Sequence, residues 1–132
     1  MAGYVVNIEE ETKKNEYFRR VLYTAGNSQL VVMTLKPGEE IGMEKHDNLD
    51  QFIRLEEGEA KVVLDGKETA IEDDWAVVIP AGTWHNVVNT GKGPLQLYTI
   101  YSPPQHPHGT IHKTKTKAEA DAAEAVEHQH AG

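Results

Sequence analysis

Residues 60–91 read AKVVLDGKETAIEDDWAVVIPAGTWHNVVNTG. Short apolar runs alternate here with turn-forming residues, and Asp65-Gly66 is a pair that tight hairpins favour. Pro80-Ala81-Gly82 ends one apolar run, and Asn89-Thr90-Gly91 ends the next. Strands repeated every 8–12 residues or so, with glycine and proline between them, predict a β-sandwich or β-barrel rather than βαβ units.

The same pattern continues on both sides of this stretch. Apolar runs occupy residues 30–35 and 51–55 before it and residues 95–101 after it. The composition then changes, and the alanine- and glutamate-rich residues 117–126 predict a short helix with Thr116 as its N-cap. We therefore expect an all-β fold, a single barrel of six to eight antiparallel strands with a short C-terminal helix.

Three segments follow from this organisation. Residues 1–28 are expected to form N-terminal strands, residues 29–102 the barrel core, and residues 103–132 an irregular segment and the helix. No internal repeat of useful length is present, which favours one barrel over two fused barrels. The acidic run 9–11 is expected to be solvated surface.

The composition excludes several classes of function. The 132-residue chain has 13 Lys+Arg and 21 Asp+Glu, a net charge of −8, so we expect no nucleic-acid partner. It contains no cysteine, which excludes disulfides, thiolate metal sites and cysteine nucleophiles. Neither a signal-peptide pattern nor a long apolar run is found, so we expect a cytoplasmic protein without a membrane partner.

Two segments carry side chains that could converge on a metal ion. Glu44 and His46 are two residues apart and would point the same way on a strand. Gln51 opens the next apolar run, and an antiparallel return could bring it beside them. His85 follows the turn at Pro80-Ala81-Gly82 on a later strand.

The spacing of these residues resembles the two motifs of the cupin family. The first motif is matched in spacing by Gly38, Glu44, His46, Gln51 and Gly58. The second motif is matched in full by Pro80, Gly82, His85 and Asn89. The resemblance covers residues 31 to about 101 and implies a cupin jelly-roll barrel.

The chain departs from the family at two ligand positions. Glu44 stands where the family usually has its first histidine, and Gln51 stands where it has its glutamate. The implied ligand set is therefore Glu44, His46, Gln51 and His85. This set has one carboxylate and therefore a formal charge of −1, which still suits a divalent ion of zinc, iron, manganese, nickel or cobalt. The alternative is a metal-free barrel in which these residues are buried polar groups.

Strand alternation predicts which other side chains face the barrel interior. If Gln51 points inward, so do Ile53 and Leu55, and by the family's pattern Leu97, Thr99 and Tyr101 do as well. Tyr101 is the candidate catalytic residue, since its phenol could donate a proton to a bound ligand. The alternative is a core aromatic with a satisfied hydroxyl.

Further histidines lie beyond the barrel strands. His106, His108 and His112 are separated by Pro107 and Gly109, which break any regular geometry, so we expect a loop at the pocket rim. A second metal site is the alternative, and His112 could close over the barrel mouth. His128 and His130 are expected to have no role.

The resemblance implies three possible functions. Mannose-6-phosphate isomerases of the cupin type bind metal with the same residue types, which favours a metal-dependent isomerase acting on a small, sugar-like substrate. A non-heme iron dioxygenase using Glu44, His46 and His85 is the first alternative, and a non-enzymatic small-molecule-binding cupin is the second. Small cupins also pair through N-terminal strands, which implies a homodimer formed by residues 4–8 or 18–24.

Overall fold

The structure, a computed structural model, describes residues 2–122. Nine strands and two helices make up this part of the chain. In chain order the elements are α1 (Ile8–Lys14), β1 (Arg19–Thr24), β2 (Gln29–Leu35), β3 (Asp50–Glu57), β4 (Glu59–Leu64), β5 (Lys67–Glu72), β6 (Ala76–Ile79), β7 (His85–Asn89), β8 (Leu95–Ser102), β9 (Ile111–His112) and a helix over residues 115–122.

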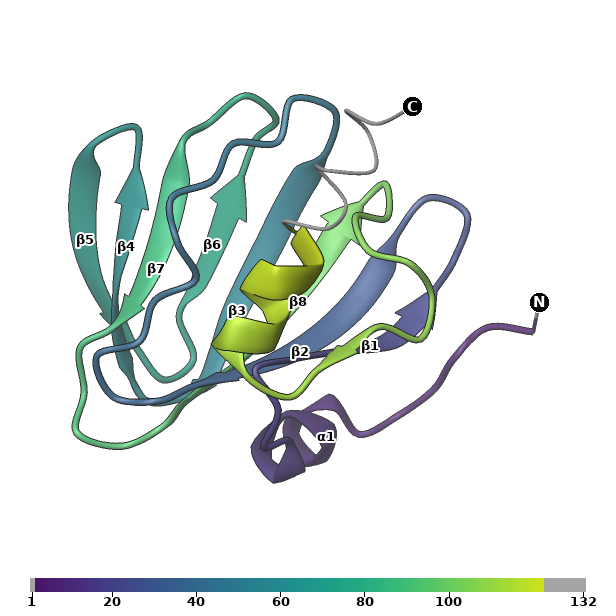
Figure 1. Ribbon diagram of the computed structural model, residues 1–132, viewed down its shortest axis with the longest axis horizontal. Coiled ribbons are helices and arrows are strands. Elements are labelled where there is room, and N and C mark those ends of the chain that lie inside the picture. Colours follow the sequence, from purple (N-terminus) through teal and green to yellow (C-terminus); the bar gives the residue numbers. More distant parts are fainter. Residues whose placement is uncertain (1, 123–132) are drawn as a thin grey trace.

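The strands form two antiparallel sheets, in agreement with the predicted all-β jelly roll. The larger sheet has the order β6-β3-β8-β2-β1-β9, and the smaller one has the order β5-β4-β7. Figure 1 shows the smaller sheet at the left and the larger one at the right. The strand count exceeds the predicted six to eight, because the short edge strand β9 comes from a segment that we predicted to be irregular.

The core lies between the two sheets and confirms the predicted alternation. Gln51, Ile53 and Leu55 of β3 are buried, whereas the residues between them are partly exposed. Leu97, Thr99 and Tyr101 of β8 are buried as predicted. Fully buried apolar side chains from both sheets fill the interior: Val31, Met33, Leu35, Ile53, Leu55, Val87, Leu95 and Leu97.

The predicted tight hairpin joins β4 and β5. Leu64 pairs with Lys67, and Asp65 and Gly66 both have positive φ, at 46° and 84°. Positive φ at both central residues is the turn geometry that matches the twist of a hairpin. The chain therefore reverses at the pair that the sequence indicated.

Gly58 links β3 to β4 where the backbone passes close to β8. A Cβ atom at this position would lie 3.0 Å from the Leu95 Cα and 3.0 Å from the Pro94 carbonyl oxygen, and φ is 117°. We expect Gly58→Ala to lower the free energy of unfolding by about 3 kcal/mol, because backbone strain and a steric clash add. Gly66→Ala is the matched control, since φ is positive there but no atom lies within 4 Å, and it should cost only about 1–2 kcal/mol. Urea unfolding of both variants measures the difference, and equal losses would contradict the clash.

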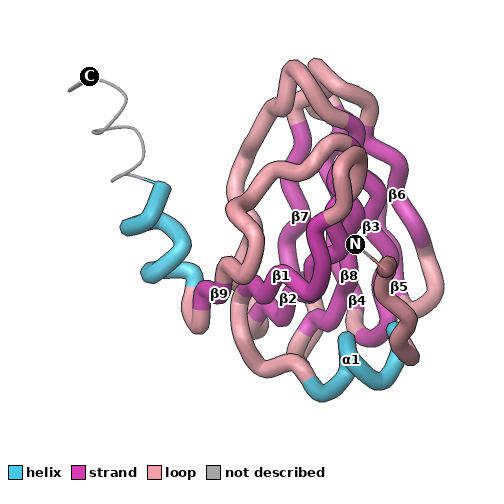
Figure 2. The backbone as a smooth tube through the Cα atoms, turned by 90° about the vertical axis from the view of Figure 1, so that its right-hand side faces the viewer, coloured by secondary structure: helices cyan, strands magenta, loops and turns pink. Residues whose placement is uncertain are grey.

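The N-terminal segment holds the helix α1 before the strand β1, whereas we predicted strands alone. The Asn7 side chain accepts a hydrogen bond from the Glu10 N–H at 3.0 Å and caps α1, and glutamates fill the first turn. Acidic residues at the N-terminus and lysines at the C-terminus complement the helix dipole. Residues 9–11 therefore belong to a capped helix below the larger sheet (Figure 2).

The C-terminal helix begins earlier than predicted. The Thr114 Oγ1 accepts a hydrogen bond from the Lys117 N–H at 3.1 Å, so Thr114 rather than Thr116 is the N-cap. Figure 2 shows this helix at one side of the two sheets, joined to them through β9. The predicted residues 123–126 of the helix, and His128 and His130, lie outside the described residues. Within residues 2–122, no helix has the length and apolar character needed to span a membrane.

Candidate metal centre

The loop between β2 and β3 brings the first candidate ligands beside β7. The sequence predicted a strand for Glu44 and His46, but residues 36–49 form a loop with only isolated bridges to β7. The Ile41 N–H donates to the Val87 carbonyl at 2.9 Å, and the Glu44 and His85 backbones exchange hydrogen bonds of 2.9 and 2.8 Å. In Figure 1 this loop runs across the face of the molecule in front of β7. Backbone pairing therefore makes Glu44 and His85 direct neighbours.

Glu44, His46 and His85 form a compact group of potential metal ligands. One ligand atom of each lies within 4.8 Å of the others. The His46 Nε2 is 3.6 Å from a Glu44 carboxylate oxygen, and the two imidazole centroids are 5.3 Å apart. The Gly82 N–H donates to the His46 carbonyl at 2.8 Å, which fixes the His46 backbone. Among residues 2–122 this is the one such group of three His or acidic residues.

The Thr83 carbonyl oxygen orients His85. It lies 2.9 Å from the His85 Nδ1, so this nitrogen carries the proton and donates. The Nε2 atom then presents a lone pair, and it is buried without a hydrogen-bond partner. A metal-binding imidazole commonly has its other nitrogen hydrogen-bonded in this way. Sequence reasoning did not identify the Thr83 carbonyl, because backbone groups leave no residue-type signal.

Gln51 presents a second buried acceptor without a partner. Its amide nitrogen donates to the Thr99 hydroxyl at 3.0 Å, which fixes the orientation of the amide. The Oε1 atom has no partner and is buried. Buried polar atoms are nearly always hydrogen-bonded in proteins, so two such acceptors in one barrel need an explanation. A divalent cation would satisfy both, and the donor set of two imidazoles, a carboxylate and an amide oxygen fits such an ion.

The protonation state of His46 suits metal binding. Burial lowers the pKa of His46, and the nearby charge of Glu44 opposes this effect without cancelling it. The imidazole is therefore neutral at pH 7 and has a lone pair available. Asp47 instead pairs with Lys45 at 3.5 Å, and Asp50 accepts a hydrogen bond from the Ala81 N–H at 2.9 Å. Asp47 therefore pairs with a neighbouring lysine, and Asp50 holds the turn at Ala81.

Tyr101 lies on the inner face of β8 beside the histidines. Its ring meets the edge of His46 at a centroid distance of 6.2 Å and that of His106 at 5.3 Å. Burial raises the pKa of Tyr101 to about 12, although the positive charge of Arg19 acts in the opposite direction. The phenol is therefore protonated at neutral pH, so it can donate a hydrogen bond or a proton but cannot serve as a base.

The three later histidines take different positions. Gln29, which is buried, holds the backbone of His106: its amide nitrogen donates to the His106 carbonyl at 2.6 Å, and its Oε1 accepts the His106 N–H at 3.0 Å. His106 lines a cavity, as expected for a loop at the pocket rim, whereas His108 is exposed. His112 is buried in β9, where its Nδ1 lies 3.1 Å from an Arg19 Nη1. The described residues do not gather these histidines into a metal-binding group.

His106 is predicted to weaken the fold in acid. Burial, reinforced by the charges of Arg19, His112 and His46, lowers the pKa of His106 from 6.5 to about 3. Below pH 6.5 the unfolded chain takes up a proton here, and the folded chain does not until about pH 3, so the free energy of unfolding falls across this window. One pH unit between the two pKa values corresponds to about 1.4 kcal/mol. Allowing for partial exposure, we expect a loss of about 2–3 kcal/mol from this residue between pH 6.5 and pH 4.

Urea unfolding at several pH values measures this loss. The His106→Gln variant should lose less free energy of unfolding than the wild type as the pH falls, because it has no group to protonate. His108→Gln is the matched control, since His108 is exposed, and it should follow the wild type. Parallel pH profiles for His106→Gln and the wild type would contradict the prediction.

Comparisons with known proteins show what the chain is similar to in sequence and in fold. The chain is 51% identical over 128 residues to the protein YrkC of Bacillus subtilis (strain 168), covering 92% of this chain and 67% of that one. The crystal structure of BH2720 from Bacillus halodurans superposes with a TM-score of 0.88 at 53% identity, covering 89% of this chain and 93% of that chain. A shorter match, 32% identical over 74 residues, covers 56% of this chain but only 16% of a mannose-1-phosphate guanylyltransferase of Escherichia coli (strain K12).

The family model of the cupin domain matches residues 31–101. This region contains Glu44, His46, Gln51, His85 and Tyr101, and it coincides with the stretch in which the sequence resembles the family. The chain belongs to the cupin family.

Proposed function

We propose that Glu44, His46, Gln51 and His85 bind a divalent metal ion, and that the protein is a metal-dependent isomerase acting on a small, sugar-like substrate. The observation that carries the proposal is the pair of buried acceptors without partners, the His85 Nε2 and the Gln51 Oε1. They accompany the compact group of Glu44, His46 and His85. The match to a mannose-1-phosphate guanylyltransferase supports a sugar-like ligand.

The chain's own residues supply orientation and a proton. When bound, the metal ion supplies Lewis acidity toward a carbonyl or hydroxyl oxygen of the ligand. The carbonyl of Thr83 holds His85 in the tautomer that leaves Nε2 free, and Thr99 holds the Gln51 amide. Tyr101, which stays protonated, donates to a ligand oxygen. The apolar interior of the barrel limits the access of water to these groups.

A non-heme iron dioxygenase is the second candidate. Two histidines and one carboxylate are the donor set of such iron sites, and Glu44, His46 and His85 match it. Gln51 distinguishes the two candidates, since an amide oxygen bound to the metal would occupy a position that oxygen chemistry needs open. The orientation imposed on Gln51 by Thr99 therefore favours the isomerase.

The test measures turnover with and without oxygen. Protein loaded with zinc, manganese, cobalt or nickel would be incubated with a panel of aldoses, ketoses and sugar acids under argon, and products would be identified by NMR. The proposal expects isomerisation without oxygen, and Glu44→Gln should abolish it. Oxygen uptake that requires iron and substrate would instead establish the dioxygenase. Ligand binding without turnover under either condition would leave a small-molecule-binding cupin.

We also propose that two copies of the chain associate through residues 4–8. Val5 is fully exposed, and Tyr4 stacks on Tyr23 at a centroid distance of 5.3 Å. The alternative segment, residues 18–24, is less available because β1 already pairs with β2 and β9. Figure 1 shows the N-terminal segment extending away from the sheets.

Val5→Asp should therefore convert the dimer into a monomer, because a buried carboxylate at the interface is unfavourable. Light scattering after gel filtration measures the mass. Val78→Asp is the matched control, since Val78 is an exposed valine on β6 and should leave the dimer intact. A wild-type protein that elutes as a monomer would contradict the proposal.

A further inference from the structure

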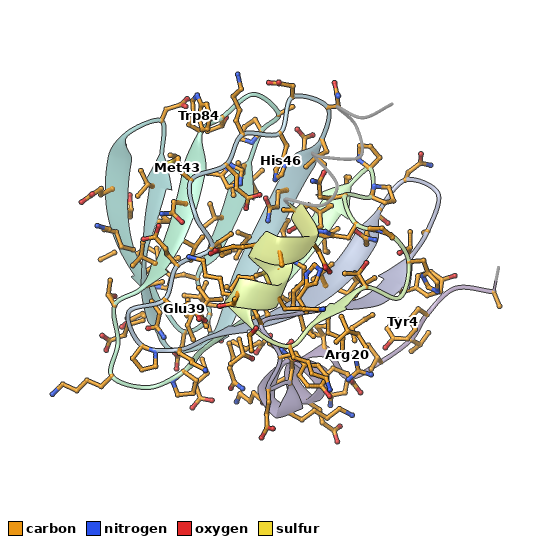
Figure 3. The ribbon with its side chains drawn as sticks, in the orientation of Figure 1. Tyr4, Arg20, Glu39, Met43, His46 and Trp84 are labelled. Atoms are coloured by element: carbon orange, nitrogen blue, oxygen red, sulfur yellow. The ribbon has the colours of Figure 1, made fainter. Side chains whose placement is uncertain are left out.

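A cavity of about 640 Å³ lies beside the candidate metal centre. Its walls come from β1, from the loop that carries Met43 and Glu44, from the loop that carries His106, and from the helix over residues 115–122. Glu44 belongs to both the cavity and the metal-ligand group. Figure 3 shows Met43 and His46 in the region above the C-terminal helix. A ligand in this cavity can therefore contact the metal centre.

Arg19 presents a buried positive charge to this cavity. The residue is 8% exposed, and its guanidinium lies over the Phe18 ring at 5.3 Å. Among the ion pairs of residues 2–122, none involves Arg19. Burying a cation without an anionic partner is costly, so a side chain of this kind is rarely retained for packing alone.

The hydrogen bonds of Arg19 leave its Nε atom without a partner. An Nη1 atom lies 3.1 Å from the His112 Nδ1, and the other nitrogen of His112 lies 2.9 Å from an Asp121 carboxylate oxygen. The Nε atom of Arg19 is buried without a partner. The Nε–H is therefore a donor that a ligand oxygen can accept from, and a hydrogen bond of this kind is charge-assisted.

Two further groups near Arg19 are neutral. Burial is the main cause of the low pKa of His106, and its Nε2 is buried without a partner. Arg19 also acts on Tyr101 through its charge and a side-chain hydrogen bond, and the phenol stays protonated. The cation therefore has hydrogen-bonding neighbours that do not neutralise it.

We propose that Arg19 binds a carboxylate group of the ligand, so that the substrate is an acid rather than a neutral sugar. The proposal rests on the proposed function for the part of the ligand that meets the metal centre. One guanidinium balances one carboxylate, and its free Nε–H can donate to one of the carboxylate oxygens. A phosphate dianion would add negative charge to a cavity that Glu44, Glu119 and Asp121 already line, with Lys115 as the further cation. The chemistry of the site therefore favours a carboxylate over a phosphate.

The probe is glycolate, with ethylene glycol as its neutral analogue and inorganic phosphate as the competing anion. NMR spectra of ¹⁵N-labelled protein, freed of metal with EDTA, would follow each titration, including the Nε–H signal of Arg19. We expect saturable binding of glycolate that moves this signal, and weaker binding of both other compounds. Because no metal is present, this outcome does not depend on whether the metal centre forms.

Arg19→Gln should weaken glycolate binding by about ten- to a hundredfold, the usual value of a charge-assisted hydrogen bond. Arg20→Gln is the matched control, because Arg20 is the next residue of β1, is partly exposed and lies well away from His46 in Figure 3. Zinc content after reloading should be unchanged in both variants. If Arg19→Gln does not fold, Arg19→Lys, which keeps the charge, replaces it.

Three results would overturn the proposal. One is wild-type protein that does not bind glycolate saturably. Another is glycolate binding that is the same in the Arg19 variant and the wild type. The third is binding of ethylene glycol or phosphate as tight as that of glycolate. If glycolate binds through Arg19 but zinc does not bind, the anion site stands and the proposed metal centre fails.

Discussion

The His85→Ala variant is expected to bind zinc at least about a thousandfold more weakly than the wild type. Loss of a group that only supports a ligand typically costs ten- to a hundredfold in metal affinity, so loss of the ligand itself should cost more. His85 is buried in β7, and its Nε2 has no other partner.

Competition with a fluorescent zinc chelator measures the affinity of each variant. His108→Ala is the matched control, because it removes an exposed imidazole outside the site and should leave affinity unchanged. Gln51→Ala should have a smaller effect than His85→Ala, since an amide oxygen is a weak ligand. Zinc affinity in His85→Ala equal to that of the wild type would contradict the assignment.

The second large effect is expected at Tyr101. Tyr101→Phe should lower kcat by about a hundredfold or more, because positioned proton donors contribute factors of that size. KM, zinc content and the free energy of unfolding should change little, since the ring still fills the inner face of β8. The pKa of about 12 means that the wild-type phenol keeps its proton over the whole assay range.

Steady-state kinetics on the substrate found in the anaerobic screen test this prediction. Tyr98→Phe is the matched control, since Tyr98 lies on the same strand but points to the other side of the sheet. A Tyr101→Phe enzyme with near wild-type kcat would favour the alternative that Tyr101 is a core aromatic.

The features of the fold that depend on local chemistry were predictable from the sequence. Asp65-Gly66 is a hairpin turn because both residues tolerate positive φ. The alternation in β3 follows from the two-residue period of a strand, which places Ile53 and Leu55 on the same face as Gln51. The inner position of Tyr101 on β8 was predicted from the family's pattern. That Glu44 and His85 lie side by side could be predicted only from the family resemblance, because a loop with two isolated bridges has no periodicity to detect.

The features that depend on distant contacts were not predictable. Helix α1 has seven residues and little apolar periodicity, so the Asn7 cap and the charges of its first and last turns were the local signals that sequence reasoning missed. Arg19 and Arg20 are adjacent in the sequence, and only the pairing of β1 with β2 and β9 determines which of them is buried. The cap at Thr114 rather than Thr116 likewise follows from the position of β9, which the sequence did not indicate.

The most direct test of the metal centre is anomalous X-ray diffraction from crystals soaked in manganese or zinc. We predict that the strongest anomalous peak lies about 2.0–2.2 Å from a Glu44 carboxylate oxygen, the His46 Nε2 and the His85 Nε2, with the Gln51 Oε1 as its neighbour. A strong peak at His106 and His112, or no peak between Glu44 and His85, would contradict the account.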